Sequence, residues 1–534
     1  MSGQADVRMR IQDLRVALAE SGVEILKGVS VELHAGRIFA LVGESGSGKS
    51  VTSMAAMRLL PEALEITGGA VQVGDQDLFD LSESAMRDVR GRRVAMIFQN
   101  AMTALNPVQT VGQQVAETLK LHTVLRGDPL RQRVVQLFTE VGIPDPDQRF
   151  SFYPHQLSGG QQQRVMIAMA LACEPEVLIA DEPTTALDVT IQEQVLKLIR
   201  DLTQSRQLAV LLITHDMGVV SNTADDVAVM YRGEIIERAS VDDFFHHPKE
   251  EYSRRLIDAL PDLTHFQSAA AEQPLLKLDD VKVHFPIRKG VLQRTVDYTR
   301  AVDGVSLHIG RAETYALVGE SGSGKSTLGR AILNLESVAG GSVQFNGEEI
   351  QHLGRKAMLP YRKQIQVIFQ NPYSSMNPRL SVGEIISEGM ESLGLGLSKE
   401  ERNKRIDDLL TRVQLGPEVV SRYPHEFSGG QLQRIAIARA LAVEPELIIC
   451  DEPTSALDVS IRSEVLDLLQ ELQREFAVSY LFITHDLSIV PTLAHQVGVM
   501  QLGKLVEQGT AEQILTRPQH PYTQALLKSV PRID

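Results

Sequence analysis

Short, uninterrupted apolar runs alternate along the chain with segments whose apolar residues recur at helical spacing. The runs at 176–182 (EVLIADE) and 208–216 (LAVLLITHD) end in polar residues, and the segment between them, 190–205 (TIQEQVLKLIRDLTQS), has an amphipathic helical pattern. Strands that are buried on both faces of a parallel sheet have such continuous apolar runs, and chemistry gathers at their carboxyl ends. This alternation predicts an α/β fold with a parallel sheet and crossover helices.

A longer helical pattern runs from Thr110 to Val141, with apolar residues at i, i+3 and i+4. The triplet Gly127, Asp128 and Pro129 interrupts it, and we expect the helix to break there. The pattern predicts a separate helical subdomain inserted ahead of the segment LSGGQ at 157–161.

Most of this pattern occurs twice. The decamer LVGESGSGKS occupies 41–50 and 317–326, and from Ser158 and Ser428 onward the matching segments stay a constant 270 positions apart. Solenoid repeats recur every 20–50 residues, so a period of this size indicates two tandem domains instead. We predict a first domain at 1–262, an exposed linker at 263–275 and a second domain at 276–534, with helical subdomains at about 100–165 and about 371–435.

Composition and charge exclude several classes of protein. A net charge of −15 without a large basic block disfavours a general nucleic-acid binder, because that affinity comes largely from Lys and Arg. With only Cys173 and Cys450, the chain lacks the cysteines for a disulfide framework, a CxxC zinc site or an iron–sulfur cluster. No signal-peptide core occurs before Gln12, and no run approaches 18 uninterrupted apolar residues. We therefore expect any membrane to be reached through another subunit.

Each decamer has the spacing GxxxxGKS of a phosphate-binding loop, or P-loop. Its glycines let the backbone approach a phosphate closely, and successive N–H groups at a helix start form an anion cradle. The lysines, Lys49 and Lys325, are expected to reach the β- and γ-phosphates, and Ser50 and Ser326 to ligate Mg²⁺. A glycine turn with a solvated lysine is the alternative for a single match, and the repetition argues against it.

Carboxylates and a histidine follow two of the predicted strands in each half. Asp181 and Asp451 close apolar runs, with Glu182 and Glu452 directly after them. A carboxylate at the end of a buried strand needs a charged partner, which here would be a metal ion or the attacking water. The alternative is that DEP forms a capping turn. The histidines His215 and His485 stand in the same place in both halves, which favours a functional role over simple packing.

The order of P-loop, LSGGQ, DEP, ALD and a later histidine resembles that of ATP-binding cassette (ABC) ATPases, twice, over essentially the whole chain. The resemblance implies two tandem nucleotide-binding domains, each with a RecA-like parallel-sheet core, a small antiparallel β-subdomain and an inserted helical subdomain. It further implies an intramolecular cassette dimer with ATP and Mg²⁺ as ligands. Each ATP would lie between the P-loop of one half and the SGGQ signature of the other.

The resemblance also implies a role for each motif residue. Glu182 and Glu452 would polarise the attacking water, Gln99 and Gln370 would sense Mg²⁺ and that water, His215 and His485 would hold the γ-phosphate, and Asp188 and Asp458 would cross the interface. Site one would use Gly43, Glu44, Ser45, Gly46, Ser47, Gly48, Lys49 and Ser50 with Ser428, Gly429, Gly430 and Gln431. Site two would use Gly319, Glu320, Ser321, Gly322, Ser323, Gly324, Lys325, Ser326 and Thr327 with Ser158, Gly159, Gly160 and Gln161. The implied Mg²⁺ ligands are Ser50, Gln99 and Asp181, and Ser326, Gln370 and Asp451.

One departure from the family pattern concerns the adenine base, which such proteins usually stack on an aromatic residue upstream of the P-loop. Phe285 stands at that place in the second half, with Tyr298 as a second candidate, whereas the first half has Leu18. Stacking stabilises by roughly 1 kcal/mol, so we expect site one to bind nucleotide severalfold more weakly than site two.

Two further segments resemble the oligopeptide/dipeptide/nickel importer branch. They are the stretches after the glutamines, FQNAMTALNP (98–107) and FQNPYSSMNP (369–378), and the two ends, HHPKEEYSRRLIDALP (246–261) and RPQHPYTQALLKSVP (517–531). Members often carry cysteines for an iron–sulfur cluster in this extension, and this chain has none there, so no cluster is expected. Two cassettes in one chain are most similar to the ATPase of microcin C/oligopeptide uptake systems.

That branch implies two integral-membrane permease subunits, indirectly a periplasmic substrate-binding protein, no nucleic acid, and one chain per transporter. The location implied is peripheral, on the cytoplasmic face of the bacterial inner membrane, where the chain would power import of peptides or peptide-like compounds. A tandem ABC ATPase acting on ribosomes or nucleic acid is the alternative. A long charged linker between the halves and a basic surface would favour it, and this chain is acidic with a short linker.

Overall fold

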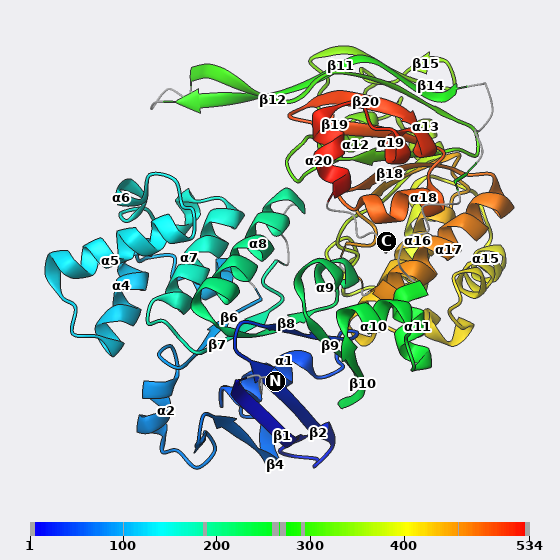
Figure 1. The fold of residues 1–534 in the computed structure, drawn as a ribbon. Coiled ribbons are helices and arrows are strands. Elements are labelled where there is room, and N and C mark those ends of the chain that lie inside the picture. The colour runs from blue at the N-terminus through cyan, green and yellow to red at the C-terminus, as the bar shows by residue number, and fades with distance from the viewer. Residues whose placement is uncertain are drawn as a thin grey trace. The chain divides into compact units, whose positions relative to one another are not determined.

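The computed structural model describes residues 6–99, 101–184, 189–258, 266–267, 274–289, 294–455, 457 and 459–528 (Figure 1). The chain forms two compact units that divide after Asp258. Position 262 and most of the predicted linker 263–275 lie outside the described residues, so the predicted domain boundaries stay predictions. Phe266 packs against apolar residues of the second unit, and the side-chain amide of Gln267 donates a 3.0 Å hydrogen bond to the Thr492 carbonyl there.

The central sheet of the first unit has six strands in the order β10-β9-β3-β8-β7-β6. Five run parallel, and β10 pairs antiparallel with β9 at one edge. Every residue of β7 and β8 is buried, which explains their continuous apolar runs. The strands are β3 (Ile38–Val42), β6 (Val94–Ile97), β7 (Val177–Asp181), β8 (Ala209–Thr214), β9 (Asp226–Tyr231) and β10 (Glu234–Ser240).

A second, antiparallel sheet covers part of this core in the order β2-β1-β4-β5. Its inward side chains, among them Leu14 and Val71, join one apolar cluster with Leu41 and Ile213 of the central sheet. The strands are β1 (Val7–Leu18), β2 (Glu24–His34), β4 (Leu64–Val73) and β5 (Gln76–Asp77).

Helices of the first unit connect these strands. Between β6 and β7 lie α3 (Ala101–Ala104), α4 (Val111–His122), α5 (Gly127–Glu140), α6 (Pro146–Arg149) and α7 (Gly159–Leu171), which form the predicted helical insertion. The predicted interruption is present but lies just before the triplet, at 123–126, because α4 ends at His122 and the triplet forms the first turn of α5. Proline has no N–H to lose in a first turn, so Pro129 is compatible with a helix start. The other helices are α1 (Lys49–Ala56), α2 (Glu83–Val89), α8 (Val189–Arg206), α9 (Met217–Thr223), α10 (Val241–His246) and α11 (Glu251–Asp258).

The second unit repeats both sheets, in the orders β16-β17-β18-β13-β19-β20 and β12-β11-β14-β15. Its first two strands form a much longer hairpin than β1 and β2, which projects from the unit in Figure 1. The strands are β11 (Pro274–Lys289), β12 (Arg294–Gly310), β13 (Thr314–Val318), β14 (Gly340–Phe345), β15 (Glu348–Glu349), β16 (Ile365–Ile368), β17 (Leu447–Asp451), β18 (Ser479–Thr484), β19 (Gln496–Gln501) and β20 (Lys504–Thr510).

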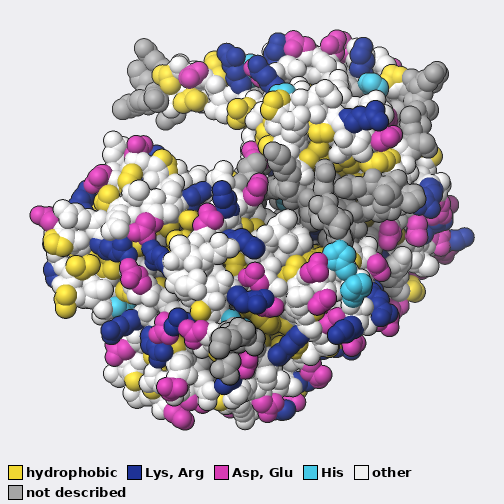
Figure 2. All heavy atoms as spheres, viewed as in Figure 1, with side chains coloured by type: hydrophobic (Ala, Val, Ile, Leu, Met, Phe, Trp, Pro, Cys, Tyr) yellow, Lys and Arg dark blue, Asp and Glu magenta, His cyan; other side chains and the backbone are white. Residues whose placement is uncertain are grey.

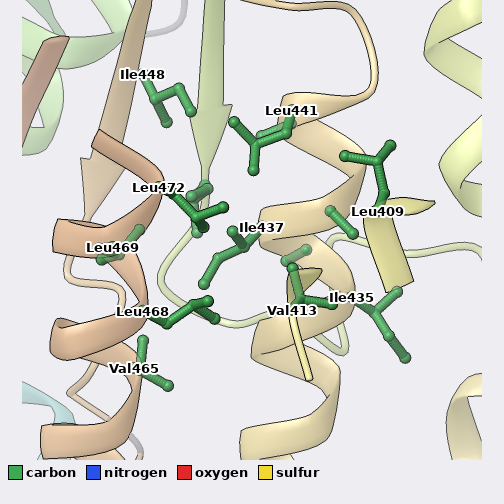
Figure 3. Packing of buried hydrophobic residues seen from close by; sticks show 14 of the residues in the cluster. Leu409, Val413, Ile435, Ile437, Leu441, Ile448, Val465, Leu468, Leu469 and Leu472 are labelled. Atoms are coloured by element: carbon green, nitrogen blue, oxygen red, sulfur yellow. The ribbon is translucent and has the colours of Figure 1, made fainter. Parts of the chain in front are cut away.

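The helices of the second unit follow the same order as those of the first. Figure 3 shows residues of α15, α16, α17 and β17 that pack in one apolar cluster of the second unit, with Ile437 of α16 pointing toward the leucines of α17. The helices are α12 (Lys325–Ile332), α13 (Leu359–Gln364), α14 (Val382–Ser392), α15 (Lys399–Arg412), α16 (Gly429–Leu441), α17 (Val459–Phe476), α18 (Val490–Leu493), α19 (Ala511–Thr516) and α20 (Pro521–Lys528). The predicted fold class is therefore confirmed in both units.

The surface carries charges of both signs. On the face shown in Figure 2, Lys and Arg side chains are interspersed with Asp and Glu in each unit. None of the helices in the described ranges is long and apolar enough to cross a membrane.

Candidate ATP sites

The loop that precedes α1 has glycine at three positions whose backbone conformation favours this residue. Gly43, Gly46 and Gly48 have φ of 150°, 78° and 109°, in the left-handed region that other residues avoid. A Cβ on Gly43 would also lie 2.2 Å from the carbonyl oxygen of Met230. The loop before α12 repeats this backbone, with φ of 151°, 76° and 105° at Gly319, Gly322 and Gly324. Each loop thus leads into a helix N-terminus, where N–H groups can bind an anion.

The two loops also share the position and contacts of their lysine. Lys49 is 6% exposed, and its Nζ donates to the carbonyl oxygens of Gly43 at 2.7 Å and Glu44 at 2.8 Å. Lys325 makes the same two bonds, to Gly319 and Glu320, at the same distances. Each ammonium group therefore lies inside the loop that would surround the phosphates.

A serine and an aspartate meet beside each lysine. Ser50 Oγ donates to Asp181 Oδ1 at 3.1 Å, and Ser326 Oγ donates to Asp451 Oδ1 at 2.7 Å. Asp181 is 5% exposed, and burial raises the pKa of this carboxyl group, as it also raises the pKa of Asp451. A hydroxyl and a buried carboxylate are oxygen ligands that Mg²⁺ prefers, and a cation there would offset the cost of burying the charge. The residues present fit the expected metal ion.

The glutamate after β7 brings together a glutamine and a histidine that are distant in sequence. Glu182 Oε2 accepts from Gln99 Nε2 at 2.6 Å, and Glu182 Oε1 lies 2.9 Å from His215 Nδ1. In the second unit Glu452 Oε2 accepts from Gln370 Nε2 at 2.8 Å and lies 3.3 Å from His485 Nδ1. The three predicted residue types thus form one group at the carboxyl ends of the strands in each unit.

Both glutamates have a strained backbone. Glu182 has φ of 45° and Glu452 has φ of 47°, and their N–H groups donate at 2.9 Å to the carbonyls of Ile213 and Ile483 in the next strand. A left-handed conformation in a residue with a Cβ costs roughly 1–3 kcal/mol and persists where the surroundings fix it. Sequence reasoning missed this feature, because neither propensity nor periodicity indicates a positive φ at Glu.

The electrostatics of the second unit favour an ionised pair. Burial by itself raises the pKa of Glu452, but the hydrogen bond and charge of His485, together with the charge of Lys325 and the hydrogen bond from Gln370, hold that pKa below its ordinary value. In return, the hydrogen bond from Glu452 raises the pKa of His485. An ionised Glu452 can orient a water molecule and accept its proton.

The SGGQ signatures begin helices α7 and α16. Ser158 caps α7, because its Oγ accepts a hydrogen bond from the Gln161 N–H and the Gln161 side chain accepts one from the Ser158 N–H. Ser428 and Gln431 form the same capping box on α16. Gly160 is buried, and a Cβ there would lie 2.5 Å from Ile191 Cγ2, as one on Gly430 would from Ile461. Ser158 and Gly159 are exposed, as are Ser428 and Gly429, so each helix start is open to a ligand. Asp188 and Asp458 lie outside the described residues.

The register of the antiparallel sheets places Leu18 and Phe285 at equivalent positions. Ile11 pairs with Val71 as Leu278 pairs with Val343, and seven positions further along lie Leu18 and Phe285. Phe285 is 38% exposed on the long hairpin, and Tyr298 of β12 is also exposed. Leu18 ends β1 and is half-buried. The two units therefore differ at the position where an aromatic was expected.

One contact of each P-loop was not predicted. The N–H of Glu44 donates to Tyr252 Oη of α11 at 3.1 Å, and the N–H of Glu320 donates to Tyr522 Oη of α20 at 3.0 Å. The 270-residue offset between Tyr252 and Tyr522 is a signal in the sequence that could have identified them.

Comparison with known proteins agrees with these motifs. The family model described as ABC transporter matches residues 26–185 and 302–455, and the one described as oligopeptide/dipeptide transporter, C-terminal region, matches 506–534. The peptidoglycan transport ATP-binding protein YejF of Agrobacterium fabrum is 46% identical over 98% of this chain and 97% of its own length. The glutathione import ATP-binding protein GsiA of Escherichia coli is 46% identical over 98% of this chain and 89% of its own length.

Among solved structures, cbiO1 from Clostridium perfringens, part of the ABC transporter complex cbiONQ, is 30% identical. It aligns with a TM-score of 0.41 over 46% of this chain and 92% of its own. The family models cover most of both halves, and the two curated relatives align with 98% of this chain. The chain belongs to the ATP-binding proteins of the oligopeptide/dipeptide ABC importer family.

Proposed function

We propose that this chain is the ATP-hydrolysing subunit that powers import of peptides or peptide-like compounds through a bacterial ABC transporter. The observation that carries the proposal is the Gln–Glu–His group beside a Ser–Asp pair, which is present in both units with nearly the same distances. In phosphoryl transfer to water, a Ser and an Asp can hold the metal ion, and a carboxylate or an amide side chain can orient the attacking water.

The residues divide the work in each unit. The P-loop amides and Lys49 would bind the phosphates, while Glu182 orients the attacking water and accepts its proton, and His215 holds the γ-phosphate. Ser50, Gln99 and Asp181 would hold Mg²⁺, as would Ser326, Gln370 and Asp451 in the second unit. When bound, this ion would neutralise part of the negative charge on the phosphates.

Each ATP would be shared between the halves. The exposed helix starts at Ser158 and Ser428 offer backbone N–H groups of the same kind as the P-loop, and an N–H cluster at a helix start favours a phosphate. Ser428 to Gln431 would complete the site of the first P-loop, and Ser158 to Gln161 that of the second. Asp188 and Asp458 would cross the interface, and one chain would serve one transporter.

The relatives suggest the partners and the kind of cargo. They are named for peptidoglycan transport and glutathione import, and both substances contain amide-linked amino acids. The chain would bind two integral-membrane permease subunits, supplied by a periplasmic substrate-binding protein, at the cytoplasmic face of the inner membrane. Microcin C-like peptides are one class of cargo to test. Fractionation with the permease subunits tests the location: recovery with ribosomes alone would instead support a translation factor.

Hydrolysis is tested with Glu182→Gln and Glu452→Gln in the full chain assembled with its permeases. Each variant is expected to lower kcat at least ~10²-fold, because a general base contributes 10²–10⁴-fold and the two sites act in one cycle. The matched control is Glu512→Gln, an exposed glutamate of α19. If one of the two site variants kept wild-type turnover, the proposal of two hydrolysing sites would fail.

A further inference from the structure

One peptide group of each P-loop is held from both sides. The carbonyl of the Gly43–Glu44 peptide accepts the bond from Lys49 Nζ at 2.7 Å, and its N–H donates to Tyr252 Oη at 3.1 Å. The tyrosine hydroxyl and the lysine ammonium thus act on opposite ends of the same rigid, planar unit. Rotation of this peptide would disturb both bonds together.

Tyr252 is itself fixed by its surroundings. It is 8% exposed, and its ring lies 4.5 Å from the ring of Tyr231 at the end of β9. Helix α11 is anchored at its start by the buried carboxylate of Glu237, which accepts from the N–H groups of Lys249 at 2.8 Å and Glu250 at 3.0 Å. Strand β10 and the capped helix α11 therefore hold the Tyr252 hydroxyl in place and give its contact with the P-loop a rigid support.

The second unit has the same chain of contacts. Glu507 of β20 accepts from the N–H groups of Gln519 at 2.7 Å and His520 at 3.0 Å, just before α20. Tyr522 of α20 then accepts from the Glu320 N–H at 3.0 Å, and the Gly319 carbonyl accepts from Lys325 at 2.7 Å.

The packing of the two tyrosine rings differs. Tyr522 lies against an apolar cluster that includes Val499 and Leu526, whereas the ring of Tyr252 lies tilted against that of Tyr231, whose equivalent in the second unit is Gln501. What the two units share is the hydroxyl contact to the P-loop. A requirement for the hydroxyl explains this pattern better than a requirement for ring packing.

We propose that Tyr252 and Tyr522 are positioning residues that fix the first peptide of each P-loop, and that helices α11 and α20 thereby set nucleotide affinity. This rests on the proposed function. When the lysine reaches a phosphate, its ammonium group leaves the carbonyl oxygens of the P-loop. The hydrogen bond to the tyrosine hydroxyl then keeps the loop in its conformation. Without the hydroxyl, the Glu44 N–H loses its partner and the loop pays more entropy on binding.

The test measures ATP affinity and turnover of the full chain with Tyr252→Phe, Tyr522→Phe and the double variant. One neutral hydrogen bond is worth about three- to tenfold in an equilibrium constant, so each single change should raise the Kd of its own site by that factor. The kcat at saturating ATP should stay within about twofold, because no reacting atom is touched. The matched control is Tyr361→Phe, which removes a hydroxyl that donates to exposed Glu348 on the antiparallel sheet.

Two readouts separate positioning from folding. Amide hydrogen exchange of the 43–50 segment should accelerate in Tyr252→Phe while the unfolding midpoint stays unchanged. Phenylalanine at position 252 should not restore the ATP affinity that Tyr252→Ala loses, because phenylalanine supplies only the ring and lacks the hydroxyl. An unchanged Kd in both Phe variants would overturn the inference, as would a fall in stability that accounts for the whole effect. If the wild-type chain bound no ATP, the proposed function itself would fail, which is a different outcome.

Discussion

Exchanging the residues at the equivalent positions Leu18 of β1 and Phe285 of β11 is expected to exchange the nucleotide affinities of the two sites. Phe285→Leu should weaken ATP binding at the site of the second P-loop, and Leu18→Phe should strengthen binding at the site of the first. The reason is that only the second unit presents an aromatic ring here, 38% exposed on its hairpin, while Leu18 offers an aliphatic side chain at the same register position.

The magnitude follows from the ring. A flat aromatic stacked on the adenine base adds about 1 kcal/mol beyond the contact area that leucine also provides, which is about fivefold in Kd. The wild type should therefore show two dissociation constants that differ by about fivefold, and Phe285→Leu should bring them together. The double variant should separate them again, with the order of the sites reversed.

Equilibrium titration of the full chain with a fluorescent ATP analogue measures both constants, in a Glu182→Gln, Glu452→Gln background that limits turnover. Ile287→Leu is the control, since Ile287 lies two residues further along the same hairpin strand with a similar exposure of 37%. Equal affinities at both sites in the wild type, or constants that neither substitution moves, would refute the reasoning.

Two further predictions concern stability. Ile437→Ala removes a fully buried side chain from the cluster in Figure 3. It should lower the free energy of unfolding of the second unit, measured by urea denaturation, by about 2–5 kcal/mol. The control Lys404→Ala, at an exposed position, should change that free energy little. His495 Nδ1 accepts the Thr314 N–H at 3.1 Å, and burial lowers the pKa of this histidine. As the pH falls, His495 is therefore protonated in the unfolded chain before it is protonated in the folded chain. The free energy of unfolding should accordingly fall as the pH drops below about 6.5. His495→Asp should reduce that loss, because Asp225 accepts the equivalent N–H in the first unit at 2.8 Å; a pH profile of the urea midpoint identical to the wild type would contradict this.

The parallel sheets and the catalytic groups could be predicted because strong local signals mark them. The buried strands at 176–182 and 208–216 have continuous apolar runs, and the polar residues that follow them meet at one edge of the sheet. The Gln99, Glu182 and His215 side chains come together for this reason. The repetition of every motif strengthened each prediction.

Other features depend on contacts that no local pattern indicates. The general behaviour of Gly and Pro predicts a helix break at 127–129, yet a first helical turn tolerates both residues, and the interruption lies just before them, after α4 ends at His122. The left-handed backbone of Glu182 is imposed by its bond to Ile213 in a neighbouring strand. The Tyr252 contact joins residues 208 positions apart, so only the folded chain reveals it.

The shared ATP site is the central claim, and cysteine cross-linking tests it most directly. The native cysteines can be removed by Cys173→Val and Cys450→Ala, which copy the equivalent residues Val443 and Ala180 of the opposite half. The pair Ser45→Cys with Ser428→Cys then places one thiol on the first P-loop and one on the second signature. Both serines are exposed, so neither substitution opens the core.

With an added thiol oxidant that accepts the two electrons, we predict a disulfide between positions 45 and 428 that depends on ATP, and likewise between Ser321→Cys and Ser158→Cys. The control pair within one half, Ser45→Cys with Ser158→Cys, should not cross-link when ATP is added. Cross-linking within the halves but not between them, with or without ATP, would contradict the shared-site account.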